Sequence, residues 1–287
     1  MRWLIIILLI CSSTITAQTK RAFLVGISDY AQDEDNAWGV IHGNNDINLL
    51  HPTLYKQGFH LTTLRNKSAS ANRIRKELKK LITSSKSGDI VYIHFSCHGQ
   101  PFEDLNGDED DGWDESLIPF DAKKVFQKGV YEGENHITDD ELNGYLKSLR
   151  SKLGPKGFVY VVVDACHAGS SYRGDEEEDS VIIRGTDKGF STSNKLYAPR
   201  INKRGKIKVE KFADLADICI IEACRSYQVN SEIFEKGKYY GSLSFYVNKT
   251  LQSIKLSRDI SWIERVVQLM NMDKRLIRQN AVVETSL

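Results

Sequence analysis

Four short runs of consecutive apolar residues, rich in β-branched side chains, recur along the chain. They read AFLVGIS from residue 22, DIVYIHFS from residue 89, FVYVVVD from residue 158 and ICIIEA from residue 218. Because apolar side chains occupy consecutive positions, both faces of each strand must be covered, as in a parallel sheet between layers of helices. The pattern predicts an α/β fold with a mostly parallel central sheet.

Between these runs, apolar residues recur at helical spacing. The first such face consists of four residues: Ile74, Leu78, Leu81 and Ile82. Ser70 is the expected N-cap of this helix, and a Thr-x-x-Glu capping box at Thr138 begins a second helix. Two more helices are expected at residues 242–256 and 262–278. The alternation of strand and helix predicts right-handed crossovers and a three-layer sandwich.

The first 17 residues have the layout of a signal peptide. Arg2 precedes an apolar stretch from Trp3 to Ile10, and small and polar residues follow as far as Ala17-Gln18. The apolar stretch is shorter than the roughly 18 residues that indicate a membrane span. We therefore expect cleavage near Ala17, no membrane span, and a periplasmic or secreted mature protein.

The overall charge favours no particular class of partner. The 287 residues include 39 Lys and Arg and 38 Asp and Glu, and loss of Arg2 with the leader makes these numbers equal. Such a balance does not favour nucleic acid or an anionic membrane. The length suits one large domain or two closely joined halves, and nothing in the composition indicates the oligomeric state.

Four cysteines follow the predicted leader: Cys97, Cys166, Cys219 and Cys224. An even number in an oxidising compartment raises the question of disulfides. Cys219 and Cys224 lie in one apolar run, where an extended chain separates them by roughly 16 Å, beyond the reach of a disulfide. We interpret both as small buried hydrophobic residues.

Two reactive segments directly follow predicted strands. Cys97-His98-Gly99 follows DIVYIHFS, and Ala165-Cys166-His167 follows FVYVVVD. The carboxyl ends of parallel strands meet at one edge of a sheet, where ligands bind in open α/β folds. A thiolate attacks carbonyl carbons, and a nearby imidazole can take and return its proton. Backbone N–H groups near Cys166 could then receive the oxyanion.

Other interpretations of these segments are less favoured. A cysteine after a buried strand is often an inert core residue, and a lone His-Gly is often a turn. Zinc accepts the ligand types of Cys97, His98, Cys166 and His167. Adjacent residues of an extended strand point to opposite faces, however, so a zinc cluster requires strong local distortion.

These segments resemble motifs of a known family. HFSCHGQ resembles the histidine motif of metacaspases, and DACHAG resembles their cysteine motif, which usually reads Asp-x-Cys-His-Ser-Gly. Further similar segments are AFLVGISDY, GNNDI, GDEDDGWDESLIPFD, ITDDEL and EACRSYQVN. The resemblance covers most of the chain from residue 21 to residue 230. It implies a three-layer caspase-like sandwich and a bacterial, metacaspase-like cysteine peptidase of the peptidase C14 type.

The resemblance also implies roles for individual residues. It makes Cys166 the nucleophile and His98 the acid/base partner, and it assigns Asp46, Ser96 and Asp164 to the pocket for the substrate side chain before the cut. Two carboxylates there suit Arg or Lys by opposite charge. Asp46 could instead cap a helix after Asn45, and Asp164 could orient a turn.

An acidic segment from Glu103 to Glu115 contains eight carboxylates and no basic residue. Such a run is ordinarily a solvated loop, but its glycines and the apolar residues that follow suggest a tight fold, which like charges resist without a cation. Calcium prefers hard oxygen ligands. The resemblance implies calcium ligands at Asp114, Asp139 and Asp140, although Asp139 and Asp140 would also suit the first turn of a helix without metal.

We therefore predict a signal peptide at residues 1–17, a large-subunit-like (p20) part at 18–170, a linker loop at 171–208 and a small-subunit-like (p10) part at 209–287. The predicted activity is hydrolysis of peptide bonds after Arg or Lys, assisted by calcium. The alternative is a catalytically silent, calcium-dependent binding module. The linker contains five basic residues where the enzyme could cut itself: Arg173, Arg184, Lys188, Arg200 and Arg204.

Overall fold

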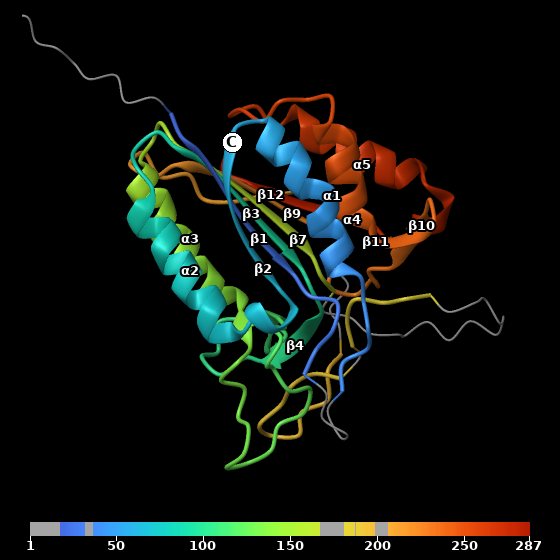
Figure 1. Ribbon diagram of the computed structural model, residues 1–287. Coiled ribbons are helices and arrows are strands. Elements are labelled where there is room, and N and C mark those ends of the chain that lie inside the picture. Colours follow the sequence, from blue (N-terminus) through green and yellow to red (C-terminus); the bar gives the residue numbers. More distant parts are fainter. Residues whose placement is uncertain (1–17, 32–36, 167–180, 187, 199–205) are drawn as a thin grey trace, which may run out of the picture.

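The computed structural model describes residues 18–31, 37–166, 181–186, 188–198 and 206–287 (Figure 1). The predicted signal peptide lies outside these residues. Within them, no helix combines the length and the apolar character needed to cross a membrane.

A seven-stranded sheet forms the centre of the molecule, in the order β2-β1-β3-β7-β9-β12-β8. Its strands are β1 (Lys20–Gly26), β2 (Phe59–Arg65), β3 (Ile90–Ser96), β7 (Phe158–Asp164), β8 (Lys206–Lys208), β9 (Asp217–Glu222) and β12 (Val282–Thr285). The first five strands in this order are parallel, β12 runs antiparallel to β9, and β8 runs parallel to β12. The four apolar runs of the sequence are β1, β3, β7 and β9, as predicted.

Helices cover both faces of this sheet (Figure 1). One face carries α2 (Ala71–Ser84) and α3 (Asp139–Leu153), and the other carries α1 (Gly43–Lys56), α4 (Ser242–Leu251) and α5 (Ser261–Met272). Each helical layer closes its own apolar core against the sheet. The predicted three-layer α/β sandwich is therefore confirmed.

The helices begin where the sequence indicates. Ser70 caps α2 by accepting a hydrogen bond from Arg73 N–H, and Thr138 caps α3 by accepting one from Glu141 N–H. The two last helices are shorter than predicted. A short 3₁₀ turn at Lys274–Leu276, capped by Asp273, follows α5.

Two small sheets border the carboxyl ends of the parallel strands. β4 (Gly99–Glu103), β5 (Trp113–Leu117) and β6 (Ile137–Thr138) form an antiparallel sheet, and β10 (Glu232–Glu235) pairs with β11 (Lys238–Gly241) in a hairpin. β4 begins immediately after His98, and β10 and β11 lead into α4. These additions enclose the edge of the sheet where the reactive segments emerge.

The described parts of the predicted linker are ordered against the domain. β8 pairs with β12, and Phe190 is buried in an aromatic cluster with Phe102 and Tyr131. The backbone of Phe190 also exchanges hydrogen bonds with Pro101 and Glu103. The described parts of the linker therefore contact both β4 and β12, while the predicted domain boundaries stay predictions.

Candidate active site

The two reactive segments leave neighbouring strands at the same level. In the parallel register of β3 and β7, Ser96 lies opposite Asp164, and His98 and Cys166 each follow two residues after the end of their strand. The N–H groups of Gly99 and Cys166 both donate to the carbonyl oxygen of Arg184, at 3.1 and 3.0 Å. A single carbonyl thus bridges the two segments.

The environment of His98 fixes its tautomer. Nε2 lies 2.8 Å from the carbonyl oxygen of Gly39, which can only accept, so Nε2 carries the proton. Nδ1 is buried and has no hydrogen-bond partner in the described part of the chain. The ring lies between Tyr30 and Trp38, and burial lowers the pKa of His98 to about 4. At neutral pH, His98 is therefore a neutral imidazole with a basic lone pair on Nδ1.

Cys166 is 1% exposed. Its thiol donates to the carbonyl oxygen of Gln228 at 3.1 Å, and its sulfur lies 3.6 Å from that of Cys224. Cys224 comes from the end of β9, the neighbour of β7 in the sheet. The nucleophile candidate thus lies beside a second buried thiol.

The three predicted pocket residues lie together, fully buried, around the side chain of Arg184. Asp46 Oδ2 accepts from Arg184 Nη2 at 2.7 Å and from Ser96 Oγ at 2.6 Å. Arg184 Nη1 donates to Ser96 Oγ at 2.7 Å and lies 3.7 Å from Asp164 Oδ1. α1 begins at Gly43, so Asp46 lies in the first turn of the helix, and the alternative role as its cap is wrong.

Glu232 is a third carboxylate in this pocket and was missed in the sequence. Its Oε1 accepts from Arg184 Nη2 at 2.7 Å and from Arg184 Nε at 3.1 Å. It begins β10, two residues after the EACRSYQVN segment. A carboxylate so close to a motif of this kind is the signal that could have identified it.

The buried charged groups around Arg184 change one another's pKa values. Burial outweighs the attraction of Arg184 and raises the pKa of Asp46 to about 6. Burial would also raise the pKa of Asp164, but Arg184 and hydrogen bonds from Asn230 and Ser244 hold it below its ordinary value. Burial opposes the charge of Arg184, and the surrounding carboxylates nevertheless keep its pKa well above the ordinary value. The surrounding carboxylates therefore favour a positive charge at the position of the Arg184 guanidinium.

Main-chain contacts hold the segment that ends at Arg184. Arg184 N–H donates to the carbonyl of Asn230 at 3.0 Å, Glu232 N–H donates to the carbonyl of Ile182 at 2.9 Å, and Ile183 forms an antiparallel bridge with Ser231. Residues 182–184 thus add a short strand to residues 230–232. Peptide ligands commonly bind to enzymes in this mode.

Gly241 forms the wall of the pocket and must lack a side chain. A Cβ there would lie 2.2 Å from Asp164 Oδ2 and 2.6 Å from Arg184 Nη1. Its backbone is extended, with φ −60°, so the requirement is one of space and not of backbone conformation. Its N–H donates to Asp46 Oδ1 at 2.9 Å.

The acidic loop gathers carboxylates next to this site. One oxygen each from Asp104, Asp108 and Asp114 lies within 4.8 Å of the others, and this is the only such group of potential metal ligands in the described residues. Burial and the charges of Asp139 and Asp140 raise the pKa of Asp114 to about 7. The Oδ1 atoms of Asp114 and Asp139 are buried without a hydrogen-bond partner.

These properties fit a hard cation. Orphaned carboxylate oxygens and mutual repulsion are relieved when a divalent ion binds, and calcium accepts several carboxylate ligands in flexible geometry. The zinc alternative includes His167, which lies outside the described residues. The cluster of Asp104, Asp108 and Asp114 contains oxygen donors only.

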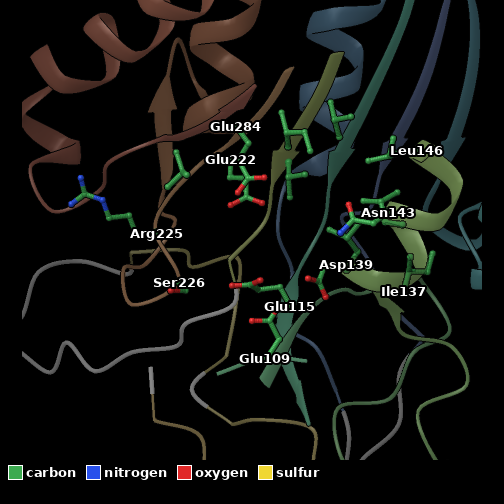
Figure 2. A pocket seen from close by; sticks show the side chains of 16 residues that line it. Glu109, Glu115, Ile137, Asp139, Asn143, Leu146, Glu222, Arg225, Ser226 and Glu284 are labelled. Atoms are coloured by element: carbon green, nitrogen blue, oxygen red, sulfur yellow. The ribbon is translucent and has the colours of Figure 1, made fainter. Parts of the chain in front are cut away.

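A cavity of 320 Å³ lies between the acidic loop, α3 and the strands β7, β9 and β12. Figure 2 shows Glu109, Glu115 and Asp139 near one another, with Glu222 and Glu284 further along on the strands. Its remaining wall is mostly apolar. Burial, with repulsion from Glu284 and Asp139, raises the pKa of Glu222 to about 8.

The profile of the "Metacaspase, peptidase C14 domain" family matches residues 20–173, more than half of the chain. The protein belongs to this family. Metacaspase-2 of Arabidopsis thaliana is 35% identical over 162 residues, which are 53% of this chain and 35% of the relative. Metacaspase-1 of Eremothecium gossypii is 26% identical over 202 residues, which are 60% of this chain and 42% of the relative. The metacaspase chain described here thus spans less than half the length of either relative.

Solved structures share the fold of this metacaspase. A protein from Geobacter sulfurreducens superposes with a TM-score of 0.64 at 19% identity, with 93% of each chain covered. Caspase-1 from Spodoptera frugiperda superposes with a TM-score of 0.54 at 14% identity, covering 93% of this chain and 88% of that one. The central sandwich is therefore of the caspase-like type, as expected from the sequence.

Proposed function

We propose that this metacaspase is a cysteine endopeptidase that cleaves after arginine, and less efficiently after lysine, with Cys166 as nucleophile and His98 as acid/base partner. This proposal rests on the way in which Arg184 is bound. Its side chain is bound by carboxylates while its carbonyl oxygen accepts from the N–H groups of Gly99 and Cys166. A substrate arginine on the acyl side of the scissile bond requires these same contacts.

We propose the following mechanism. Nδ1 of His98 takes the proton of the Cys166 thiol, which first turns away from the Gln228 carbonyl, and the sulfur attacks the carbonyl carbon of the bound arginine. The carbonyl oxygen of the arginine becomes negative in this step, and the N–H groups of Gly99 and Cys166, which already donate to it, stabilise the charge. His98 then gives its proton to the leaving amine. Water, deprotonated by His98, hydrolyses the acyl-thioester and regenerates the thiol.

The preference for arginine over lysine rests on the shape of the contacts. Arg184 donates from Nε, Nη1 and Nη2 to three different side chains: Glu232, Ser96 and Asp46. A guanidinium supplies several donors in one plane, whereas a lysine ammonium is a compact point charge on a flexible stem. A lysine could satisfy the charge of this pocket but only part of its hydrogen bonds.

We propose calcium as the cofactor, with Asp104, Asp108 and Asp114 as ligands and Asp139 and Asp140 beside them. When bound, calcium would supply positive charge that neutralises the loop, and it takes no part in the covalent chemistry. The loop joins β4, which begins after His98, to β5. Asn106 already links it to Asp140 through a hydrogen bond of 2.6 Å. Ordering of this loop would support the segment that carries His98.

We further propose that Arg184 is a site of self-cleavage. The bond that follows it, to Gly185, lies where a substrate bond would be cut, and Arg184 blocks the pocket until that bond breaks or the segment leaves. Of the five basic residues named above as candidate cut sites in the linker, Arg173, Arg200 and Arg204 lie outside the described residues. Lys188 is exposed and makes no contact with the carboxylate pocket that the described residues record.

The test is cleavage of a fluorogenic peptide ending in Ile-Ile-Arg, with and without calcium, by the wild type and by Cys166→Ala. We expect release of the fluorophore by the wild type only, and weaker activity on the matching lysine peptide. If the folded wild type releases no more fluorophore than Cys166→Ala, the proposal is contradicted and the catalytically silent binding module is favoured. Activity that survives in Cys166→Ala would assign the chemistry elsewhere.

A further inference from the structure

Cys166 and Cys224 form a pair of buried thiols at the edge of the sheet. Their sulfurs lie 3.6 Å apart, and both donate to the carbonyl oxygen of Gln228, at 3.1 Å from Cys166 and 3.5 Å from Cys224. Cys166 is 1% and Cys224 7% exposed, and the two make a small buried cluster of their own. One shared acceptor therefore holds both sulfurs near contact distance.

The backbone beneath the pair suits a disulfide. β7 and β9 are parallel neighbours in which Val163 lies opposite Glu222, and Ala223 N–H donates to the Val163 carbonyl at 3.0 Å. Cys166 and Cys224 follow within three residues of these positions. Neighbouring strands lie about 4.8 Å apart, within the Cα separations of about 4.4 to 6.8 Å that disulfides span. Closing the bond requires side-chain rotation more than backbone movement.

We propose that Cys224 is a resolving cysteine, which forms a reversible disulfide with Cys166 when a peroxide oxidises the site. The bond itself does not depend on the proposed peptidase function. Its consequence does, because a Cys166 sulfur held in a disulfide cannot attack a peptide carbonyl.

The chemistry balances with hydrogen peroxide as oxidant. The thiolate of Cys166 attacks one peroxide oxygen, an S–O bond forms, the O–O bond breaks, and the departing hydroxide takes a proton to become water. Cys224 then attacks the sulfenic sulfur, an S–S bond forms, and the S–O bond breaks. The second hydroxide takes the proton of Cys224. Two thiols and one peroxide thus yield one disulfide and two waters, and a dithiol reductant reverses the change.

The position of Arg184 controls access to this pair. Its carbonyl oxygen is hydrogen-bonded to Cys166 N–H, so the segment covers the reactive sulfur. Oxidation should be slower while this segment is seated. The Arg184→Ala variant removes the side-chain contacts that hold it and serves as the open form.

The experiment exposes the wild type and Arg184→Ala to hydrogen peroxide, blocks remaining thiols, and maps peptides by mass spectrometry without reduction. We expect a linked peptide pair containing Cys166 and Cys224 at a mass about 2 Da below the sum of the separate peptides. A dithiol should restore both thiols and any peptidase activity that was lost. Cys219→Ser, a change to a buried cysteine away from the site, should leave the linkage unchanged.

Cys224→Ser gives the contrasting result. Without the resolving thiol, Cys166 should remain as a sulfenic acid that a dimedone probe labels, or proceed to higher oxides that a dithiol does not reverse. Absence of the Cys166–Cys224 linkage in both the wild type and Arg184→Ala, after Cys166 has been oxidised, would overturn the proposal. Because the linkage is read by mass, this outcome is distinct from a failure of peptide cleavage.

Discussion

Arg184 is held both by its side chain and by its main-chain carbonyl oxygen. Its guanidinium is held by Asp46 and Glu232, each at 2.7 Å, and its carbonyl oxygen meets the N–H groups at the ends of β3 and β7. Binding of the side chain therefore fixes where the reacting carbonyl lies. Such positioning accounts for a large part of enzymatic rate enhancement.

Gly241→Ala tests the shape of this pocket. The added methyl group would occupy space now filled by Arg184 Nη1, so arginine should no longer seat fully. We expect kcat/KM for an arginine peptide to fall by about 100-fold or more, since a misplacement near 1 Å has effects of that size. Gly144→Ala, at a helical glycine with open space around it, is the control for loss of flexibility. An unchanged kcat/KM in folded Gly241→Ala would contradict the assigned pocket.

Glu232→Gln tests the third carboxylate. The amide keeps the shape of the side chain but loses its charge, and a hydrogen bond to a charged partner is worth about 1.5 to 3 kcal/mol. We expect kcat/KM for arginine peptides to fall about tenfold to hundredfold, mostly through KM. Glu235→Gln in the same hairpin provides the comparison, and equal kinetics of the two variants would remove Glu232 from the pocket.

At the residue scale, the sequence predicted residues that line the pocket but not the arginine side chain that lies in it. Asp46, Ser96 and Asp164 could be named because each stands in or beside a recognisable motif. Arg184 was named only as a candidate cut site and not as the occupant of this pocket, because its ion pair with Asp46 joins positions 138 residues apart in sequence. Only the folded chain brings them together.

At the scale of elements, the parallel pairing of β3 and β7 places the reactive residues. Their apolar runs were readable because every residue of both strands is buried. α1 was not predicted, since Pro52 and several polar residues interrupt its apolar pattern. β8, β12 and the β10–β11 hairpin were also missed, because strands of three or four residues give too short a pattern to recognise.

Glu222 on β9 predicts a dependence of stability on pH. A glutamate ionises near pH 4.5 in the unfolded chain and, here, near pH 8 in the folded one, so the folded state binds more protons between these values. The free energy of unfolding therefore falls as pH rises through this window in calcium-free buffer. Glu222→Gln should raise Tm by about 2 to 4 °C at pH 8.

The same substitution should have little effect well below pH 4.5, where Glu222 carries the proton in both the folded and the unfolded wild type. Thermal unfolding of Glu222→Gln across this pH range, with Glu264→Gln on the exposed face of α5 as control, measures the difference. A Tm difference that does not grow with pH would show that Glu222 is ionised in the folded protein.

At the scale of the whole molecule, the acidic loop joins β4 to β5 and contacts the first turn of α3 through the hydrogen bond from Asn106 to Asp140. Burial, together with repulsion from Asp140, raises the pKa of Asp139 to about 6. The described fold therefore stores unfavourable electrostatic energy around Asp114 and Asp139. A bound cation would convert this repulsion into stability.

Calcium should accordingly raise Tm by about 5 to 10 °C at a hundredfold excess over its Kd, from the linkage of binding to folding. Asp114→Asn should lose most of this shift, while Asp214→Asn, an exposed residue outside the loop, should retain it. Because the pKa of Asp114 is near 7, the shift should shrink as pH falls below 7 and the carboxyl is protonated. Equal shifts in the two variants would exclude the acidic loop as the site.

The most direct measurement is the intact mass and new amino terminus of the chain after incubation with calcium. The wild type should be cut between Arg184 and Gly185, so that one fragment begins at Gly185, while Cys166→Ala and Arg184→Ala should show no cut at this bond. A wild-type chain that cleaves arginine peptides yet never breaks at Gly185, or a Cys166→Ala chain cut there as fast as the wild type, would contradict the account.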